Sequence, residues 1–175
     1  MDISDKNLTE RFEFRSIFKN EADQAVIIEQ ICFPPNEACS EKDMKDRIDK
    51  ASELCLVAVD KTTGKIAGLL NGLATDEEVF RDEFFTNAEL YEPSGKNIMI
   101  LGLDVLPEYR MQGLGRELVS QYIRRERDNG RRMIKLTCLE SIVNMYKKMG
   151  FLDKTIRRLT GKEIQKPMLA GYSMV

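Results

Sequence analysis

The residues best suited to bind a phosphate lie in one short turn of the chain. The turn spans residues 110–116, has the pattern Arg-x-x-Gly-x-Gly, and follows apolar residues over 98–105 that predict a buried strand. Apolar residues at helical spacing follow, so the turn lies where a helix begins, with backbone N–H groups unpaired and the helix dipole positive. Gly113 and Gly115 lack a Cβ, so an anion can approach the backbone closely. The chemistry implied is the binding of a pyrophosphate.

Two common phosphate-binding loops do not fit this turn. The stretch lacks the Gly-x-x-x-x-Gly-Lys-Ser/Thr pattern of P-loop proteins. Leu118 stands where a dinucleotide-binding loop has its third glycine, and no suitably spaced acidic residue completes that motif. An isolated glycine turn is also compatible with a simple tight connection between a strand and a helix.

A second motif follows one predicted strand later, where a helix carrying Tyr146 ends at Gly150 and Phe151. Tyr146 falls four residues after Ile142, so packing in the core is an alternative reading of that position. Together the two motifs, in this order, resemble motifs A and B of the GCN5-related N-acetyltransferase (GNAT) family. The resemblance covers residues 12–151 and weakens after that.

The resemblance implies a fold and a set of site residues. The fold is of the α/β (α+β) class: one domain over residues 1–175, with a mixed, mostly antiparallel sheet of about seven strands, splayed at its central strands and flanked by about four helices. Tyr146 is the expected general acid, which returns a proton to the departing thiolate. Gly102 suits a bulge in the central strand. The residues expected to bind acetyl-CoA are Leu103, Asp104 and Val105 along the pantetheine arm, and Met111, Gln112, Gly113, Leu114, Gly115 and Arg116 at the pyrophosphate.

The stretch over residues 137–146 is similar to that of the arylalkylamine (serotonin-type) N-acetyltransferases. Those enzymes carry two histidines where this chain has Met99 and Leu101, and neither of these side chains can accept a proton. Leu139 also replaces an asparagine that many family members use to contact pantetheine. A carboxylate, Tyr91 or a water chain must therefore serve as the base. The carboxylate candidates, left unranked, are Glu37, Asp76, Asp104 and Glu140.

The function implied is acetyl transfer from acetyl-CoA to a primary amine of a small molecule. Transfer is expected to be direct, in a ternary complex, because no nucleophile is indicated; Cys138 falls inside a predicted strand, where cysteine is commonly just buried. Two alternatives stay open: a relative that binds CoA or acyl-CoA without turnover, and an acetyltransferase for protein amines.

Composition narrows the class of protein further. The chain has 175 residues with 32% charged residues and a formal net charge of −2, which argues against a dedicated nucleic-acid binder. It has no histidine and no Cys-x-x-Cys pair, so no metal site is expected. No apolar run approaches the length of a membrane span and no signal-peptide pattern opens the chain, which predicts a cytoplasmic protein without a membrane partner. A homodimer is an expectation from the family alone.

The remaining pattern predicts the elements that position these residues. Residues 1–10 are expected to be a loose end or a brief lead-in, and residues 86–96 a loop that forms one wall of the acceptor site or a surface excursion. Arginines between positions 124 and 132 form a basic cluster, either a solvated face or an attractor of the CoA 3′-phosphate or an acidic partner. Strands are expected over 12–16, 54–60, 65–74, 98–105, 132–138, from 151 onward and 171–175, with a polar linker over 158–167 between the last two. Helices are expected from residue 20 to about 32 and over 41–51, 75–85, 114–128 and 141–149.

Overall fold

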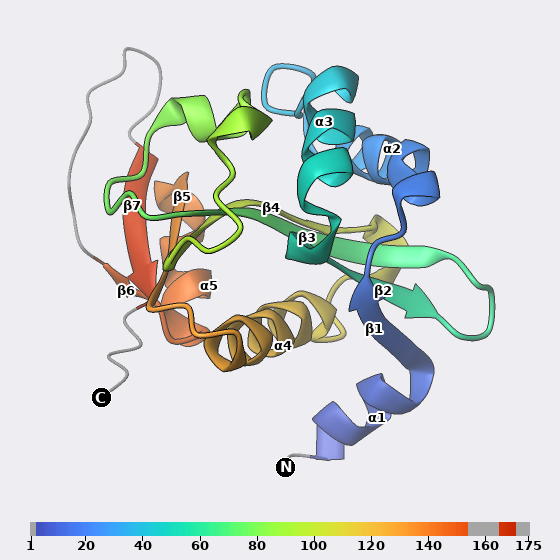
Figure 1. Ribbon diagram of the computed structural model, residues 1–175. Helices are drawn as coiled ribbons and strands as arrows, with labels where there is room; N and C mark the ends of the chain where they lie inside the picture. The colour runs from blue at the N-terminus through green and yellow to red at the C-terminus, as the bar shows by residue number, and fades with distance from the viewer. Residues whose placement is uncertain (1–2, 154–164, 171–175) are drawn as a thin grey trace.

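The computed structural model describes residues 3–153 and 165–170, which form one sheet with helices on both of its faces (Figure 1). Helices α2 (Ala22–Cys32) and α3 (Glu41–Ala51) cover one face. Helices α4 (Leu114–Asp128) and α5 (Val143–Lys148) cover the other, where α1 (Ile3–Arg11) packs beside α4. The sheet therefore lies between two helical layers.

The sheet is mixed, with its strands in the order β1-β2-β3-β4-β5-β7-β6. The pair β4–β5 is parallel, and every other described pair is antiparallel. Five strands, β1–β5, supply the buried side chains of the described sheet. Strand β6 has only two residues, and β7 is described by its backbone alone. The expected count of about seven strands is reached only when these two are included. The bounds are β1 Phe12–Ser16, β2 Cys55–Asp60, β3 Ile66–Thr75, β4 Asn97–Val105, β5 Met133–Leu139, β6 Leu152–Asp153 and β7 Gln165–Ala170.

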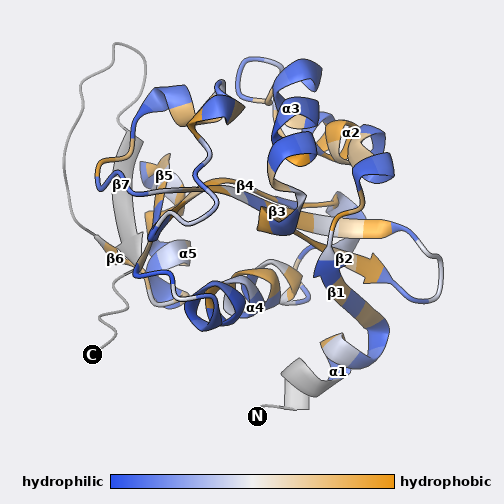
Figure 2. Ribbon diagram, viewed as in Figure 1, coloured by the Kyte–Doolittle hydropathy of each residue, from blue (hydrophilic) through white to orange (hydrophobic). Residues whose placement is uncertain are grey.

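Apolar side chains fill the space between the sheet and each helical layer, and the helices turn their polar sides outward (Figure 2). Strands β2 and β3 are buried along their whole length because helices cover both faces of the sheet. Tyr122 of α4 is fully buried and donates its hydroxyl hydrogen to Leu54 O at 3.0 Å. The apolar stripe predicted for α4 faces this core and comprises Leu114, Leu118, Tyr122 and Ile123.

Strands β4 and β5 separate partway along their length. Their pairing ends where Ile100 lies opposite Leu136. Beyond that point β4 continues to pair with β3 as far as Val105, and β5 continues to pair with β7 as far as Leu139. The splay implied by the resemblance is therefore present, and it leaves one backbone edge of β4 without a neighbouring strand.

A β-bulge in β4 accompanies this separation. Asn71 of β3 lies opposite Gly102, but the next residue, Gly72, lies opposite Ile100. Leu101 is thus an extra residue in β4 with no partner in β3. A bulge bends its strand and increases the local twist, which turns the end of β4 away from β5. The prediction that Gly102 suits a bulge agrees with this register.

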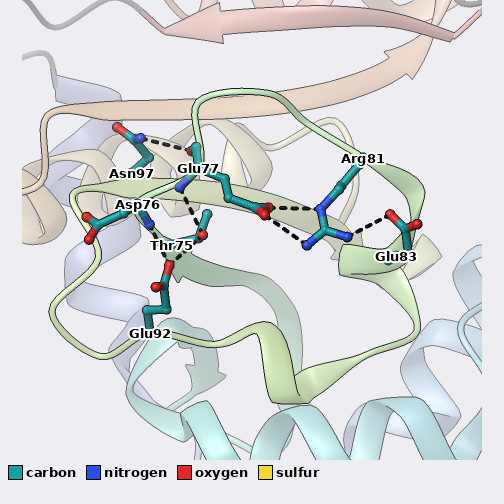
Figure 3. A network of polar contacts seen from close by, with 7 residues as sticks. All are labelled: Thr75, Asp76, Glu77, Arg81, Glu83, Glu92 and Asn97. Carbon is teal, nitrogen blue, oxygen red and sulfur yellow. Dashed lines mark hydrogen bonds and ion pairs between the residues drawn. The ribbon is translucent and has the colours of Figure 1, made fainter.

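The segment between β3 and β4 is fastened to the sheet by polar contacts (Figure 3). Glu92 accepts hydrogen bonds from Thr75 Oγ1 at 2.8 Å and from the backbone N–H of Asp76 at 2.7 Å. Arg81 pairs with Glu77 at 2.9 Å. Both ends of the segment are therefore fastened to the sheet by side-chain hydrogen bonds.

A buried ion pair ties the end of this segment to α4. Glu126 is fully buried, and its Oε2 accepts from Arg131 Nε at 3.1 Å. The same guanidinium donates to the carbonyls of Pro93, at 2.9 Å, and Gly95. Arg131 was predicted to be part of a basic surface cluster, but in the structure it joins the segment before β4 to α4.

Several element predictions were wrong. Residues 3–11 form helix α1, which gains its order by placing Leu8 against the core of the α4 face. Residues 75–85 contain only a 3₁₀ helix, Asp82–Phe85, because the polar contacts of Figure 3 hold the preceding residues in an irregular path. The chain has five α-helices in its described part, not about four. Strand β7 overlaps a stretch expected to be a linker, and the strand expected over 171–175 lies outside the described residues.

Helix α3 begins as its sequence predicts. Ser40 is the N-cap, and its Oγ accepts from the backbone N–H of Asp43 at 3.1 Å. Replacing Ser40 by alanine leaves that N–H without its partner, so we expect Ser40→Ala to lower the free energy of unfolding by about 1 kcal/mol, measured by urea denaturation. Ser120→Ala, at an exposed position inside α4, is the control and should change it by less than about 0.5 kcal/mol. Equal losses in both variants would contradict the capping role.

Candidate active site

The turn before α4 presents a row of unpaired backbone N–H groups. The first described hydrogen bond into α4 runs from Glu117 N to Gly113 O at 3.0 Å. Among the described residues, no acceptor faces the N–H groups of residues 111–116, and Gly113 gives the helix no side-chain cap. Such a row at a helix N-terminus suits a pyrophosphate. The predicted phosphate-binding residues are therefore together in space, although Leu114 offers only its N–H because its side chain is buried.

Contacts from neighbouring elements hold this turn in place. Arg110 Nε donates to Val105 O at 2.8 Å, which ties the turn to the end of β4. Tyr109 donates its hydroxyl hydrogen to Asp60 Oδ2 at 3.0 Å, and this contact ties the turn to β2. Arg11 of α1 donates to the side chain of Gln112 at 2.9 Å. The N–H groups are thus fixed before any ligand arrives, which favours binding.

The two glycines of the turn have different physical roles. Gly113 has φ +82°, and Met111 also has a positive φ of 61° with a fully exposed side chain. Gly115 has no such backbone constraint, and a Cβ there would meet Val105 Cγ2 at 3.6 Å and Leu103 Cδ2 at 3.8 Å, which are ordinary contacts. Gly113 is therefore needed by the fold, and Gly115 is needed only if something must approach the backbone at the mouth of the splay.

The open edge of β4 leads from this turn toward the sheet interior. Leu103 and Val105 are half-buried and pack against the α4 face of the core. Asp104 lies on the opposite face and is fully buried. The backbone of these residues can pair with an extended ligand such as pantetheine because β5 has diverged. The side chain of Asp104, however, does not point to the same side as those of its neighbours.

Tyr146 lies at the other side of the splay. Its side chain is buried, and its ring packs edge-on against Phe151 with centroids 5.6 Å apart. Burial, together with the nearby Cys138 and Asp104, raises the pKa of Tyr146 well above its ordinary value. The phenol therefore stays protonated across the neutral range, as a proton donor must.

The structure separates the carboxylate candidates for a base. Glu37 and Glu140 are exposed. Asp76 accepts from the backbone N–H of Lys96 at 3.0 Å, and Tyr91 contacts the carboxylate of Glu53. Asp104 remains as a buried carboxyl beside the splay.

Sequence reasoning missed the partner of Asp104. Glu29 of α2 is 5% exposed, and its Oε1 accepts from the backbone N–H of Cys39 at 2.9 Å. Its position four residues after Ala25, on the apolar side of α2, was the signal that a buried carboxyl stood there.

Met99 and Leu101, which stand where the similar enzymes have histidines, belong to an apolar cluster with Leu73, Phe80 and Phe84. The buried side chains of this cluster are all apolar, and Tyr91 packs against it. The positions are thus filled by packing, and the base must come from elsewhere.

The basic cluster divides into structural and groove-lining arginines. Arg125 donates to Ser16 Oγ at 3.1 Å and to Glu53 O at 2.7 Å, so it is structural like Arg131. A groove of about 350 Å³ runs between α4 and α5. Its lining includes the cationic side chains of Arg116, Arg124, Arg127 and Lys148.

Over the described residues, no group of three or more His, Cys, Asp or Glu side chains is arranged to hold a metal ion. Within the same part of the chain, no helix is both long and apolar enough to cross a membrane.

Comparison with known proteins identifies the family to which this chain belongs. The model of the acetyltransferase (GNAT) family matches residues 22–151. A search of curated protein sequences found no match. Among solved structures, the chain is similar to the GphF GNAT-like decarboxylase in complex with isobutyryl-CoA, with TM-score 0.74, 16% identity, and coverage of 91% of this chain and 98% of that one.

Two further structures share the fold. The ribosomal-protein-S18-alanine N-acetyltransferase of Escherichia coli matches with TM-score 0.68 and 20% identity, over 94% of this chain and 96% of that one. The protein yncA of Salmonella typhimurium, solved with acetyl-CoA, matches with TM-score 0.66 and 15% identity, over 94% of this chain and 95% of that one. At these identities the likeness concerns the fold.

The contrast between the two glycines is testable. We expect Gly115→Ala to leave the free energy of unfolding nearly unchanged but to weaken acetyl-CoA binding about 10- to 100-fold, because its methyl group displaces the ligand from N–H donors. Gly113→Ala should instead cost about 1–2 kcal/mol of stability through its left-handed backbone. Calorimetric titration with acetyl-CoA and urea denaturation measure the two effects. Unchanged affinity in Gly115→Ala would contradict the approach of a ligand at this turn.

Proposed function

Because the chain belongs to the GNAT family of acetyltransferases, we propose that it transfers an acetyl group from acetyl-CoA to a primary amine of a small molecule. Transfer is direct, within a complex that holds both substrates. The observation that carries this proposal is the splay of β4 from β5, with the unpaired N–H groups of residues 111–116 at one end and Tyr146 at its side.

Each part of the coenzyme has a place that suits its chemistry. The pyrophosphate lies on the backbone at the start of α4, where the helix dipole favours negative charge. The pantetheine arm extends the sheet along the open edge of β4, from Val105 toward Gly102. The groove between α4 and α5, with its four cationic side chains, suits the 3′-phosphate.

The residues of the chain then divide the chemistry. A backbone N–H at the open edge of β4 donates to the thioester oxygen and stabilises the negative charge that forms there. Tyr146 gives its proton to the sulfur as the C–S bond breaks. Cys138 takes no part as a nucleophile, because it is buried within β5.

The acceptor side lies above β4, opposite α4. Helices α2 and α3 and the fastened segment between β3 and β4 surround this side (Figure 1). The polar contacts of Figure 3 make this wall an ordered one, which favours an acceptor of defined shape. A protein amine is the alternative acceptor, and a panel containing both small amines and peptides distinguishes them.

Tyr146→Phe tests the proton donor. Removing the hydroxyl leaves the packing on Phe151 intact, so we expect acetyl-CoA affinity to stay within about twofold while kcat falls by about 10²–10⁴. Because the pKa of Tyr146 is raised, the wild-type rate should not decline on the alkaline side until the pH exceeds the ordinary tyrosine value of about 10. Thiol release at several pH values measures both.

Tyr122→Phe is the matched control, because Tyr122 is also a buried tyrosine with a raised pKa. It should lose stability through its bond to Leu54 O but retain its kcat. Equal kcat in wild type and Tyr146→Phe would refute the acid role. Acetyl-CoA binding without thiol release on any amine would favour a relative that binds acyl-CoA without turnover.

A further inference from the structure

Helix α1 contacts the phosphate-binding turn through two of its side chains. Leu8 is buried, and its Cδ1 lies 3.7 Å from the point where a Cβ on Gly113 would stand. Arg11 is the last residue of α1, and its Nη1 donates to Gln112 Oε1 at 2.9 Å. The two contacts fall on neighbouring residues of the turn, directly before α4 begins. Helix α1 therefore borders the stretch over residues 111–116 whose N–H groups are free.

The guanidinium of Arg11 also holds the turn at a second point. It lies over the ring of Tyr109, with Cζ 5.4 Å from the ring centroid, and its Nη2 is 3.5 Å from Asp60 Oδ2. The same carboxylate oxygen accepts from the Tyr109 hydroxyl at 3.0 Å. The Arg11 side chain therefore contacts the turn both before and after Met111.

The backbone between these two points is strained. Met111 has a φ of 61°, a left-handed conformation that residues with a Cβ rarely adopt. Its side chain is fully exposed, so no packing of its own compensates for the strain. Such a conformation persists only where the surrounding contacts restrain it. The contacts at Tyr109 and Gln112 supply a restraint of this kind, and Arg11 takes part in both.

Helix α1 in turn depends on tertiary contacts for its own order. It spans 9 residues, Ile3–Arg11, and an isolated helix of this length is marginal in water. Leu8 and Arg11 supply such contacts at the turn, and Arg11 also places a positive charge at the negative end of the helix dipole. A restraint that joins two parts of a protein acts on both, so a ligand that fixes the turn also favours the folded state of α1.

We propose that Arg11 is a positioning residue for acetyl-CoA, and that α1 and the coenzyme stabilise each other through it. This inference rests on the proposed function. Arg11 keeps the turn in the conformation that leaves its N–H groups free, so the pyrophosphate meets donors that are already arranged. Without this restraint the turn would have to be ordered during binding, which lowers affinity. Arg11 acts through the turn and has no part in the transfer of the acetyl group.

Calorimetric titration with acetyl-CoA tests the positioning role. We expect Arg11→Ala and Gln112→Ala each to weaken binding about 5- to 30-fold, because each removes the hydrogen bond between the guanidinium and the turn. The two losses should not multiply in the double variant, since both substitutions break the same contact. Arg11→Lys should recover only part of the affinity, because an ammonium group does not reproduce the fork of donors and the stacking on the ring.

Steady-state kinetics separate positioning from catalysis. In Arg11→Ala the KM for acetyl-CoA should rise by about the same factor as the Kd, while kcat changes less than about twofold. A fall in kcat at saturating acetyl-CoA with an unchanged KM would overturn the positioning role. Thermal unfolding of each variant distinguishes these effects from loss of the fold.

Arg15→Ala is the matched control. Arg15 also lies over an aromatic ring, with Cζ 3.9 Å from the centroid of Phe18, and it pairs with Glu21 at 2.7 Å. These partners belong to the segment that leads into α2 rather than to the turn. The substitution should lower stability but leave acetyl-CoA affinity within about twofold of wild type. Unchanged affinity in Arg11→Ala, or an equal loss in Arg15→Ala, would overturn the assignment.

Hydrogen exchange measures the reciprocal effect without turnover. Saturating acetyl-CoA should slow exchange of the backbone amides of α1 in the wild type, and this slowing should largely disappear in Gln112→Ala, although α1 itself is unaltered in that variant. Exchange in α1 that does not respond to acetyl-CoA bound by the wild type would overturn the coupling while leaving the proposed function intact. Failure of the wild type to bind acetyl-CoA would overturn the proposed function and this inference with it.

Discussion

The structure depends on one interruption in the hydrogen bonding of its sheet. Strands β4 and β5 stop pairing after Ile100 and Leu136, although each keeps its other neighbour. Backbone groups inside a sheet are normally paired, so the groups on this open edge are free to bind water or an extended ligand. The bulge at Leu101, the turn before α4 and the buried Tyr146 are all arranged around this opening. The architecture thus provides a slot for an extended ligand with an anionic end.

The apolar interior of the protein limits which side chains can accept a proton at the site. Met99 and Leu101 lie in an apolar cluster, and neither side chain can accept a proton. The opposite face of β4 instead carries Asp104 beside Glu29, in surroundings where removing charge from water alters proton affinity. Burial thereby raises the pKa of the Asp104 carboxyl above its ordinary value.

The sequence predicted the parts of the fold that depend on local pattern. The alternating strands, the stripe on α4, the Ser40 cap and the glycine turn are all local signals, and each was found. Helix α1 was missed because tertiary packing, rather than its own pattern, orders it. Glu29 was missed as a partner for the same kind of reason, since its meeting with Asp104 joins residues far apart in the chain. Residue types predicted the turn and the tyrosine, but only the fold could rank the carboxylates.

Under the proposed function, the unpaired N–H groups before α4 also affect the stability of the protein, because acetyl-CoA would bind there. A ligand that binds only the folded chain stabilises it by about 2.7 kcal/mol at a concentration one hundred times its Kd. The turn before α4 and the open edge of β4 gain the most stability from such binding, because their backbone groups find hydrogen-bond partners only in a ligand. Under the proposed function, acetyl-CoA should therefore protect the folded chain against proteolysis in proportion to its concentration above the Kd.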